Sequence, residues 1–158
     1  GAGWPVAAVA GGRAELATIA DSTADHRGTY NGSTASMAAV VAAVDAIGGG
    51  GIHRHLDAIG SRLHAGMAEI ATGLGVRLRI RGYPAVFALA LVDRDPGEPW
   101  EDTAEPDWPA YQRLAAELID RGIWVSRRGN WYVSAAHTDD DVTRTLDAFH
   151  AALKTVAG

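Results

Sequence analysis

The segment 26–32 carries residue types that can hold an anion. It reads His-Arg-Gly-Thr-Tyr-Asn-Gly and leads directly into the alanine-rich stretch 33–47, which predicts a helix. The hydroxyl and the backbone N–H of Thr29 can each donate a hydrogen bond to a phosphate oxygen, and Gly28 lets the backbone approach closely. The entrance of a helix also favours negative charge. The segment is therefore a candidate phosphate seat, although the residues alone favour an ordinary turn before a threonine-capped helix.

Two adjacent arginines, Arg127 and Arg128, form the second candidate site. Arginine stays charged and can hold a carboxylate with two parallel hydrogen bonds. The sequence Arg-Arg-Gly-Asn separates the apolar segments 123–126 and 131–134, which predicts a hairpin with both arginines at its tip. Because side chains alternate along a strand, only one of the two could serve a bound group. Exposed turn arginines without a ligand are the alternative.

Composition excludes several kinds of chemistry. The chain of 158 residues has no cysteine, so it contains no disulfide, thiolate nucleophile or cysteine-based metal site. Its net charge of −5 gives no basic surface for nucleic acid. No apolar run reaches the roughly 18 residues that cross a membrane, and His137 has no second ligand beside it at metal-binding spacing. The single lysine, Lys154, is expected to be a solvated surface residue.

The first half of the chain predicts two kinds of structure. The continuous apolar run 6–10 predicts a strand that is buried on both faces, and 13–20 predict a short helix. A glycine run at 48–51 ends the helix expected at 33–47. After it, 52–74 predict a long amphipathic helix from apolar residues at three- and four-residue spacing. The part before the glycines therefore looks like the end of a larger α/β domain.

The second half predicts a small α+β layer, with helices on one face of a sheet. The expected elements are, in chain order, strands at 76–81 and 85–92, an exposed loop at 93–107, a helix at 109–120, strands at 123–126 and 131–134, and a last helix capped by Thr138.

Four sequence pieces, taken in this order, match one known family. They are Gly1-Ala2-Gly3-Trp4-Pro5-Val6, Gly11-Gly12-Arg13, Gly28-Thr29-Tyr30-Asn31-Gly32 with Met37-Ala38-Ala39, and Ser134-Ala135-Ala136-His137-Thr138 with Asp141. Over essentially its whole length, the chain resembles the C-terminal part of the class III aminotransferases, which depend on pyridoxal phosphate (PLP). It is most similar to the branch that contains glutamate-1-semialdehyde aminomutase.

The resemblance implies the fold and the cofactor. The fold would be the α/β fold type I of PLP-dependent transferases, with residues 1–50 as the end of the large cofactor-binding domain. Residues 51–158 would form a connecting helix and the small α+β domain. The cofactor would be PLP, bonded to a lysine expected upstream of Gly1, so that no catalytic residue lies in this chain. Gly28 and Thr29 would bind the cofactor phosphate of the neighbouring subunit in a homodimer.

The resemblance also implies an activity. The enzyme would be a cytoplasmic aminotransferase that moves an amino group from an amino acid or amine to a keto acid or aldehyde. Arg128, or otherwise Arg127, would bind the substrate carboxylate, and Trp124 and Trp131 could wall the pocket. Two alternatives stay open, a 2,1-aminomutase and a non-catalytic α+β interaction domain. The sequence does not identify the substrate.

Overall fold

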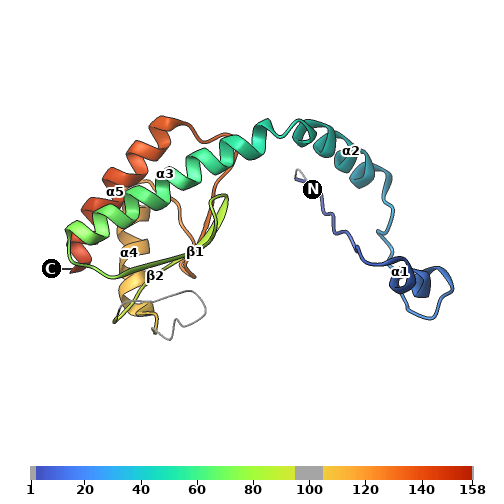
Figure 1. The fold of residues 1–158 in the computed structure, drawn as a ribbon, viewed down its shortest axis with the longest axis horizontal. Helices are drawn as coiled ribbons and strands as arrows, with labels where there is room; N and C mark the ends of the chain where they lie inside the picture. The colour runs from blue at the N-terminus through green and yellow to red at the C-terminus, as the bar shows by residue number, and fades with distance from the viewer. Residues whose placement is uncertain (1–2, 95–104, 158) are drawn as a thin grey trace. The chain divides into compact units, whose positions relative to one another are not determined.

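A computed structural model describes residues 3–94 and 105–157 (Figure 1). The chain divides into two compact units, Gly1–Gly51 and Ile52–Gly158. This boundary lies one residue from the one expected, although the assignment of each unit to a domain of a larger enzyme stays a prediction. Most of the loop expected at 93–107 lies outside the described residues.

The first unit holds two helices, α1 (Arg13–Ala20) and α2 (Thr34–Gly48), as predicted. The buried strand expected at 6–10 is wrong, because these residues are not a strand and nearly all of them are exposed. A strand buried on both faces needs neighbouring strands and a covering layer. The described residues of this unit offer neither, and the only buried residue of α2 is Ser36.

The glycine run ends α2 as expected. Gly49 caps the helix, Gly50 has the left-handed φ of +69°, and α3 (Gly51–Gly73) begins at the next residue. Over the described ranges, no single helix is long and apolar enough to cross a membrane, although α2 and α3 taken together as a bent pair pass that test.

The second unit contains a three-stranded antiparallel sheet in the order β1-β2-β3. Strands β1 (Leu78–Tyr83) and β2 (Val86–Leu91) pair along their full length, and β3 (Asn130–Tyr132) pairs with the first half of β2. On β2, Phe87, Leu89 and Leu91 are buried, whereas Val86 and Ala88 are exposed; Ala90, near the end of the strand, is buried as well. The sheet therefore has one face that the helices cover, as predicted.

The hairpin expected between 123–126 and 131–134 is wrong. Only the second segment contains a strand, and that strand pairs with β2. The first segment instead follows helix α4 (Trp108–Asp120), to which it is bonded at both ends. The Ile123 N–H donates to Leu118 O at 2.9 Å, and the Ser126 carbonyl accepts from the Tyr111 hydroxyl. These bonds hold it against the helix, so it does not pair as a strand.

Helices α3, α4 and α5 (Asp139–Ala157) bury one apolar core with β2. Figure 1 shows α3 and α5 running side by side. Two glycines let α3 approach its neighbours closely, Gly60 at the turn between β1 and β2 and Gly66 at α5. A Cβ at Gly60 would lie 2.8 Å from the Cα of Pro84, in the turn between β1 and β2, and a Cβ at Gly66 would lie 2.5 Å from Leu146 of α5. Burial of the core side chains removes apolar surface from water and is the main stabilising contribution.

Candidate functional site

The predicted phosphate seat is a compact loop held by its own backbone and by Asn31. The Asn31 N–H donates to Gly28 O at 3.0 Å, and its side-chain amide donates to His26 O at 2.9 Å. Thr29 is exposed, and neither its amide nor its hydroxyl bonds to another described residue. The loop is thus fixed by groups other than the two donors of Thr29, which remain open to a ligand.

The N-terminus of α2, which follows the predicted phosphate seat, could also favour an anion. Ser33 occupies the N-cap position with φ −49° and ψ 122°, but its hydroxyl makes no capping hydrogen bond. The first turn of the helix therefore has no side-chain acceptor at its N-terminus, where the helix dipole favours an anion.

Arg27, beside the seat, is already paired. Its guanidinium donates two hydrogen bonds of 2.8 Å to the Asp25 carboxylate, and its backbone N–H donates a third, of 3.0 Å. These bonds lower the pKa of Asp25 and raise that of Arg27. The positive charge next to Gly28 is balanced by Asp25, so Thr29 and the backbone are the remaining donors.

Arg127 and Arg128 lie in a tight turn that we call the arginine turn, residues 126–129. The Arg128 N–H donates to Ser126 Oγ at 3.2 Å, and the Gly129 N–H donates to Ser126 O at 3.3 Å. Both arginine side chains are exposed and form no ion pair with other described residues. Because they stand in a turn and not in a strand, alternation does not place them on opposite faces.

The far end of the arginine turn is fixed to the sheet. The Leu89 N–H donates to Gly129 O at 2.9 Å. Gly129 has a left-handed φ of +86°, and a Cβ there would meet Leu89 O at 2.8 Å and the Trp108 ring at 3.3 Å. Only glycine fits this position without strain.

The near end of the turn is fixed by Tyr111, which sequence reasoning missed. The fully buried Tyr111 hydroxyl donates to Ser126 O at 2.9 Å and accepts from Trp131 Nε1 at 3.2 Å. Burial raises the pKa of this hydroxyl, which therefore keeps its proton at neutral pH. In the sequence Tyr111 falls on the apolar stripe of the helix at 109–120, and nothing there distinguishes it from a core residue.

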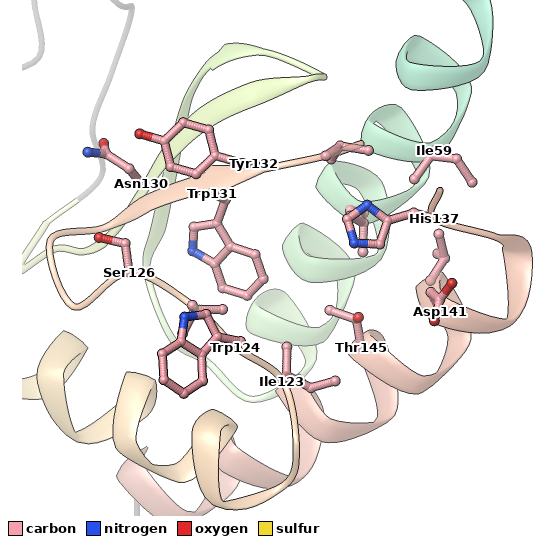
Figure 2. A pocket seen from close by; sticks show the side chains of 14 residues that line it. Ile59, Ile123, Trp124, Ser126, Asn130, Trp131, Tyr132, His137, Asp141 and Thr145 are labelled. Atoms are coloured by element: carbon pink, nitrogen blue, oxygen red, sulfur yellow. The ribbon is translucent and has the colours of Figure 1, made fainter. Parts of the chain in front are cut away.

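A cavity of about 370 Å³ adjoins the arginine turn. Its walls come from both arms of the turn, 123–126 and 130–133, and from α3 and the start of α5. Figure 2 shows the Trp131 indole among the lining side chains, with Trp124 and His137 on different sides of it. Trp124 is 90% exposed, which is unusual for so large an apolar side chain. Neither arginine lines this cavity.

His137 makes hydrogen bonds that hold the turn before α5. Its Nδ1 accepts a hydrogen bond of 2.9 Å from the Ser134 N–H, and its carbonyl accepts one of 2.8 Å from His55 Nε2. The next residue, Thr138, exchanges hydrogen bonds with Asp141 in a capping box at the start of α5. The bond from the Thr138 N–H is the main reason why the pKa of Asp141 is lowered.

His64, on α3, is partly buried. Its Nε2 is buried and has no hydrogen-bond partner among the described residues. The ring packs edge-on against Phe87, with 4.2 Å between the centroids. Desolvation lowers the pKa of His64, so the ring is held neutral. Lys154, by contrast, is exposed in the last turn of α5, as expected.

Known proteins resemble this chain both in sequence and in fold. No protein-family model matches the chain. The chain is 29% identical over 157 residues to the glutamate-1-semialdehyde 2,1-aminomutase of Methanococcoides burtonii, which is 98% of this chain and 37% of that relative. It therefore spans little more than a third of the length of this curated relative.

Solved structures agree with the sequence match. An omega-transaminase from Sphaerobacter thermophilus matches with a TM-score of 0.76 and 26% identity, covering 94% of this chain and 35% of that one. The PLP internal aldimine form of the FumI protein from Sphingopyxis sp. MTA144 matches with a TM-score of 0.57 and 30% identity, covering 66% of this chain and 23% of that one. Sequence and fold agree that the chain is similar to class III aminotransferases of fold type I, as a segment that matches the C-terminal part of these relatives.

Proposed function

We propose that this chain is part of a PLP-dependent aminotransferase in which Thr29 binds the cofactor phosphate. The observation that carries the proposal is the pair of unused donors on Thr29, at a helix entrance, in a chain that matches this family over nearly its full length. The phosphate would belong to the cofactor of the neighbouring subunit of a cytoplasmic homodimer.

The residues of the seat suit a phosphate group. The Thr29 hydroxyl and amide supply two donors, and the absence of a side chain on Gly28 leaves the backbone accessible. A Cβ at Gly28 would lie 2.8 Å from the Oδ1 of Asn31, the residue whose side-chain N–H donates to His26 O and helps to hold the loop. PLP, when bound, supplies an electron sink for the substrate carbon that loses a proton. The lysine that holds PLP is expected upstream of Gly1, and Lys154 is not a substitute because it lies on the exposed side of α5.

The substrate side of the site is proposed for the arginine turn. Arg128, or otherwise Arg127, would bind the carboxylate of an amino donor through two parallel hydrogen bonds. Neither guanidinium forms an ion pair with a described residue, so no carboxylate among these residues competes with a substrate for them, which supports this role.

Transamination is preferred to isomerisation within one substrate. An omega-transaminase is among the matching structures, and an arginine for a free carboxylate suits an enzyme that exchanges one amino acid for another. A 2,1-aminomutase is the second candidate, because the curated relative carries that name. A non-catalytic α+β domain is the third, and absence of any cofactor absorbance from the full-length protein would favour it.

The proposal is tested by replacing Thr29 with alanine in the full-length protein. Loss of one hydrogen bond to a charged group costs about 1.5–3 kcal/mol, so the dissociation constant of PLP is expected to rise roughly ten- to hundredfold. Thr72→Ala is the matched control, because the Thr72 hydroxyl is exposed and bonds only to Ala68 O of its own helix. Equal PLP affinity in the two variants would reject the phosphate seat.

A further inference from the structure

The buried hydroxyl of Tyr111 connects helix α4 to both arms of the arginine turn. Tyr111 donates to Ser126 O at the start of the turn and accepts from Trp131 Nε1 just beyond its end. The Tyr111 side chain is completely buried, so water does not replace either bond from the helix side. A single hydroxyl therefore ties helix α4 to both arms of the arginine turn.

Ser126 is the residue on which the arginine turn is built. Its carbonyl accepts hydrogen bonds from both Tyr111 and the Gly129 N–H, and its hydroxyl accepts one from the Arg128 N–H. The position of Ser126 thus sets the backbone path through Arg127 and Arg128. In the described part of the chain, the hydrogen bond that anchors the Ser126 carbonyl to a helix is the one from Tyr111.

The two ends of the turn have different supports. The Gly129 end is bonded to Leu89 of β2 and is closed in by Trp108. These contacts do not involve the Tyr111 hydroxyl, so they would remain if it were removed. Loss of the hydroxyl would release the Ser126 end alone, and the arginines between the ends would shift without unfolding the sheet.

We propose that Tyr111 is a positioning residue for the arginine that binds the substrate carboxylate, an inference that rests on the proposed function. Two parallel hydrogen bonds to a carboxylate require the guanidinium plane to be held within a fraction of an ångström of its productive position. Tyr111 provides this through Ser126 and touches neither substrate nor cofactor. Its removal leaves the arginine charged and exposed but misaligned.

The experiment compares Tyr111→Phe with the wild-type full-length protein on two amino donors, one with a carboxylate and one simple primary amine. The phenyl ring keeps the packing of α4 and removes only the hydroxyl. The variant loses two hydrogen bonds, and the one to Ser126 O is the one that holds the arginine turn. Loss of this one neutral bond predicts a rise in KM for the carboxylate donor of roughly three- to tenfold. The kcat of both donors and the KM of the amine are expected to stay within about twofold of wild type.

Tyr83→Phe is the matched control. It makes the same change at a tyrosine that is 82% exposed at the end of β1 and lies outside the arginine turn and the cavity beside it. This variant is expected to leave the KM of both donors unchanged. Amide hydrogen exchange at Arg128 and Gly129 is expected to accelerate in Tyr111→Phe and not in Tyr83→Phe.

Parallel Arg127→Ala and Arg128→Ala variants separate the two ways in which the inference could fail. If one arginine variant raises the KM of the carboxylate donor and Tyr111→Phe does not, the positioning role is wrong while the carboxylate site stands. If neither arginine variant changes that KM, both are wrong. A rise in KM by the same factor for both donors in Tyr111→Phe would assign the hydroxyl a structural role only and would also overturn the inference.

Discussion

Gly60→Ala tests whether α3 lies directly on the turn between β1 and β2. The Cβ of the new alanine would come within van der Waals contact of three backbone atoms of Pro84, the farthest at 2.8 Å, where real Cβ atoms are essentially never found below about 3.0 Å. Backbone atoms cannot rotate away as a side chain can. The helix and the turn must therefore separate, and the packing around Ile59 and Leu63 must open with them.

The expected cost follows from two opposing contributions. Overpacking a well-filled core costs about 1–3 kcal/mol, and rigid backbone neighbours place this site at the upper end. Alanine is favoured over glycine within a helix by about 1 kcal/mol, which offsets part of that cost. The net prediction is a loss of about 2 kcal/mol in the free energy of unfolding. With a urea m value of about 2 kcal/mol/M, the midpoint of unfolding should fall by about 1 M.

The assay is urea unfolding followed by tryptophan fluorescence, with Gly73→Ala as the control in the same helix. A Cβ at Gly73 would meet nothing within 4 Å, and this glycine ends α3. That variant should keep or raise stability, by up to about 1 kcal/mol. A Gly60→Ala protein as stable as Gly73→Ala would refute the close approach of α3 to Pro84.

The other predictions concern the charge of Arg128 and the partly buried ring of His64. Arg128→Ala should raise the KM of carboxylate donors more than that of simple amines, because it removes a charged partner of the carboxylate and nothing that an amine needs. Steady-state kinetics on both donors checks this prediction. Equal effects on the two KM values would show that Arg128 does not bind the substrate carboxylate. His64 should make stability depend on pH, because desolvation holds its pKa in the folded protein below the value of about 6.5 of an unfolded histidine. Between these two pKa values the unfolded chain binds more protons, so the free energy of unfolding should fall as the pH drops below about 6.5 and level off below the folded pKa. His64→Leu should flatten that slope in urea unfolding between about pH 5 and 7, and an unchanged slope would show that another group causes it.

Helices could be predicted from the sequence because their signals are local. The acidic cap and the proline before the apolar stripe mark the start of α4, where Asp107 accepts from the Ala110 N–H at 2.9 Å. Thr138 and Asp141 mark the start of α5 in the same way. The spacing of apolar residues then gives the face that each helix buries.

Strands were harder to predict because pairing depends on partners elsewhere in the chain. The run 6–10 has a strand-like composition but no neighbouring strand in the described part of its unit. The segment 123–126 also has such a composition, yet its bonds go to α4. Composition reports that a segment is apolar, and only the fold decides what covers it.

The residues of the candidate site also differ in whether a local sequence signal marks them. Gly28 and Thr29 could be proposed from a glycine and a hydroxyl at a helix entrance, and they stay a prediction, while the cofactor came only from the family resemblance. Tyr111 could not be found, because a hydroxyl on an apolar stripe is indistinguishable in sequence from any buried tyrosine. Its role depends on Ser126, which lies 15 residues farther along the chain.

Mixed dimers test whether Thr29 binds a phosphate across a subunit interface. One subunit carries Thr29→Ala, and the other carries alanine in place of the lysine expected upstream of Gly1. PLP retained after desalting is then counted per dimer. The mixed dimer is expected to retain one PLP firmly, because the lysine of the first subunit meets the intact Thr29 of the second. Retention no better than in the Thr29→Ala homodimer would show that Thr29 does not bind the phosphate of the neighbouring subunit.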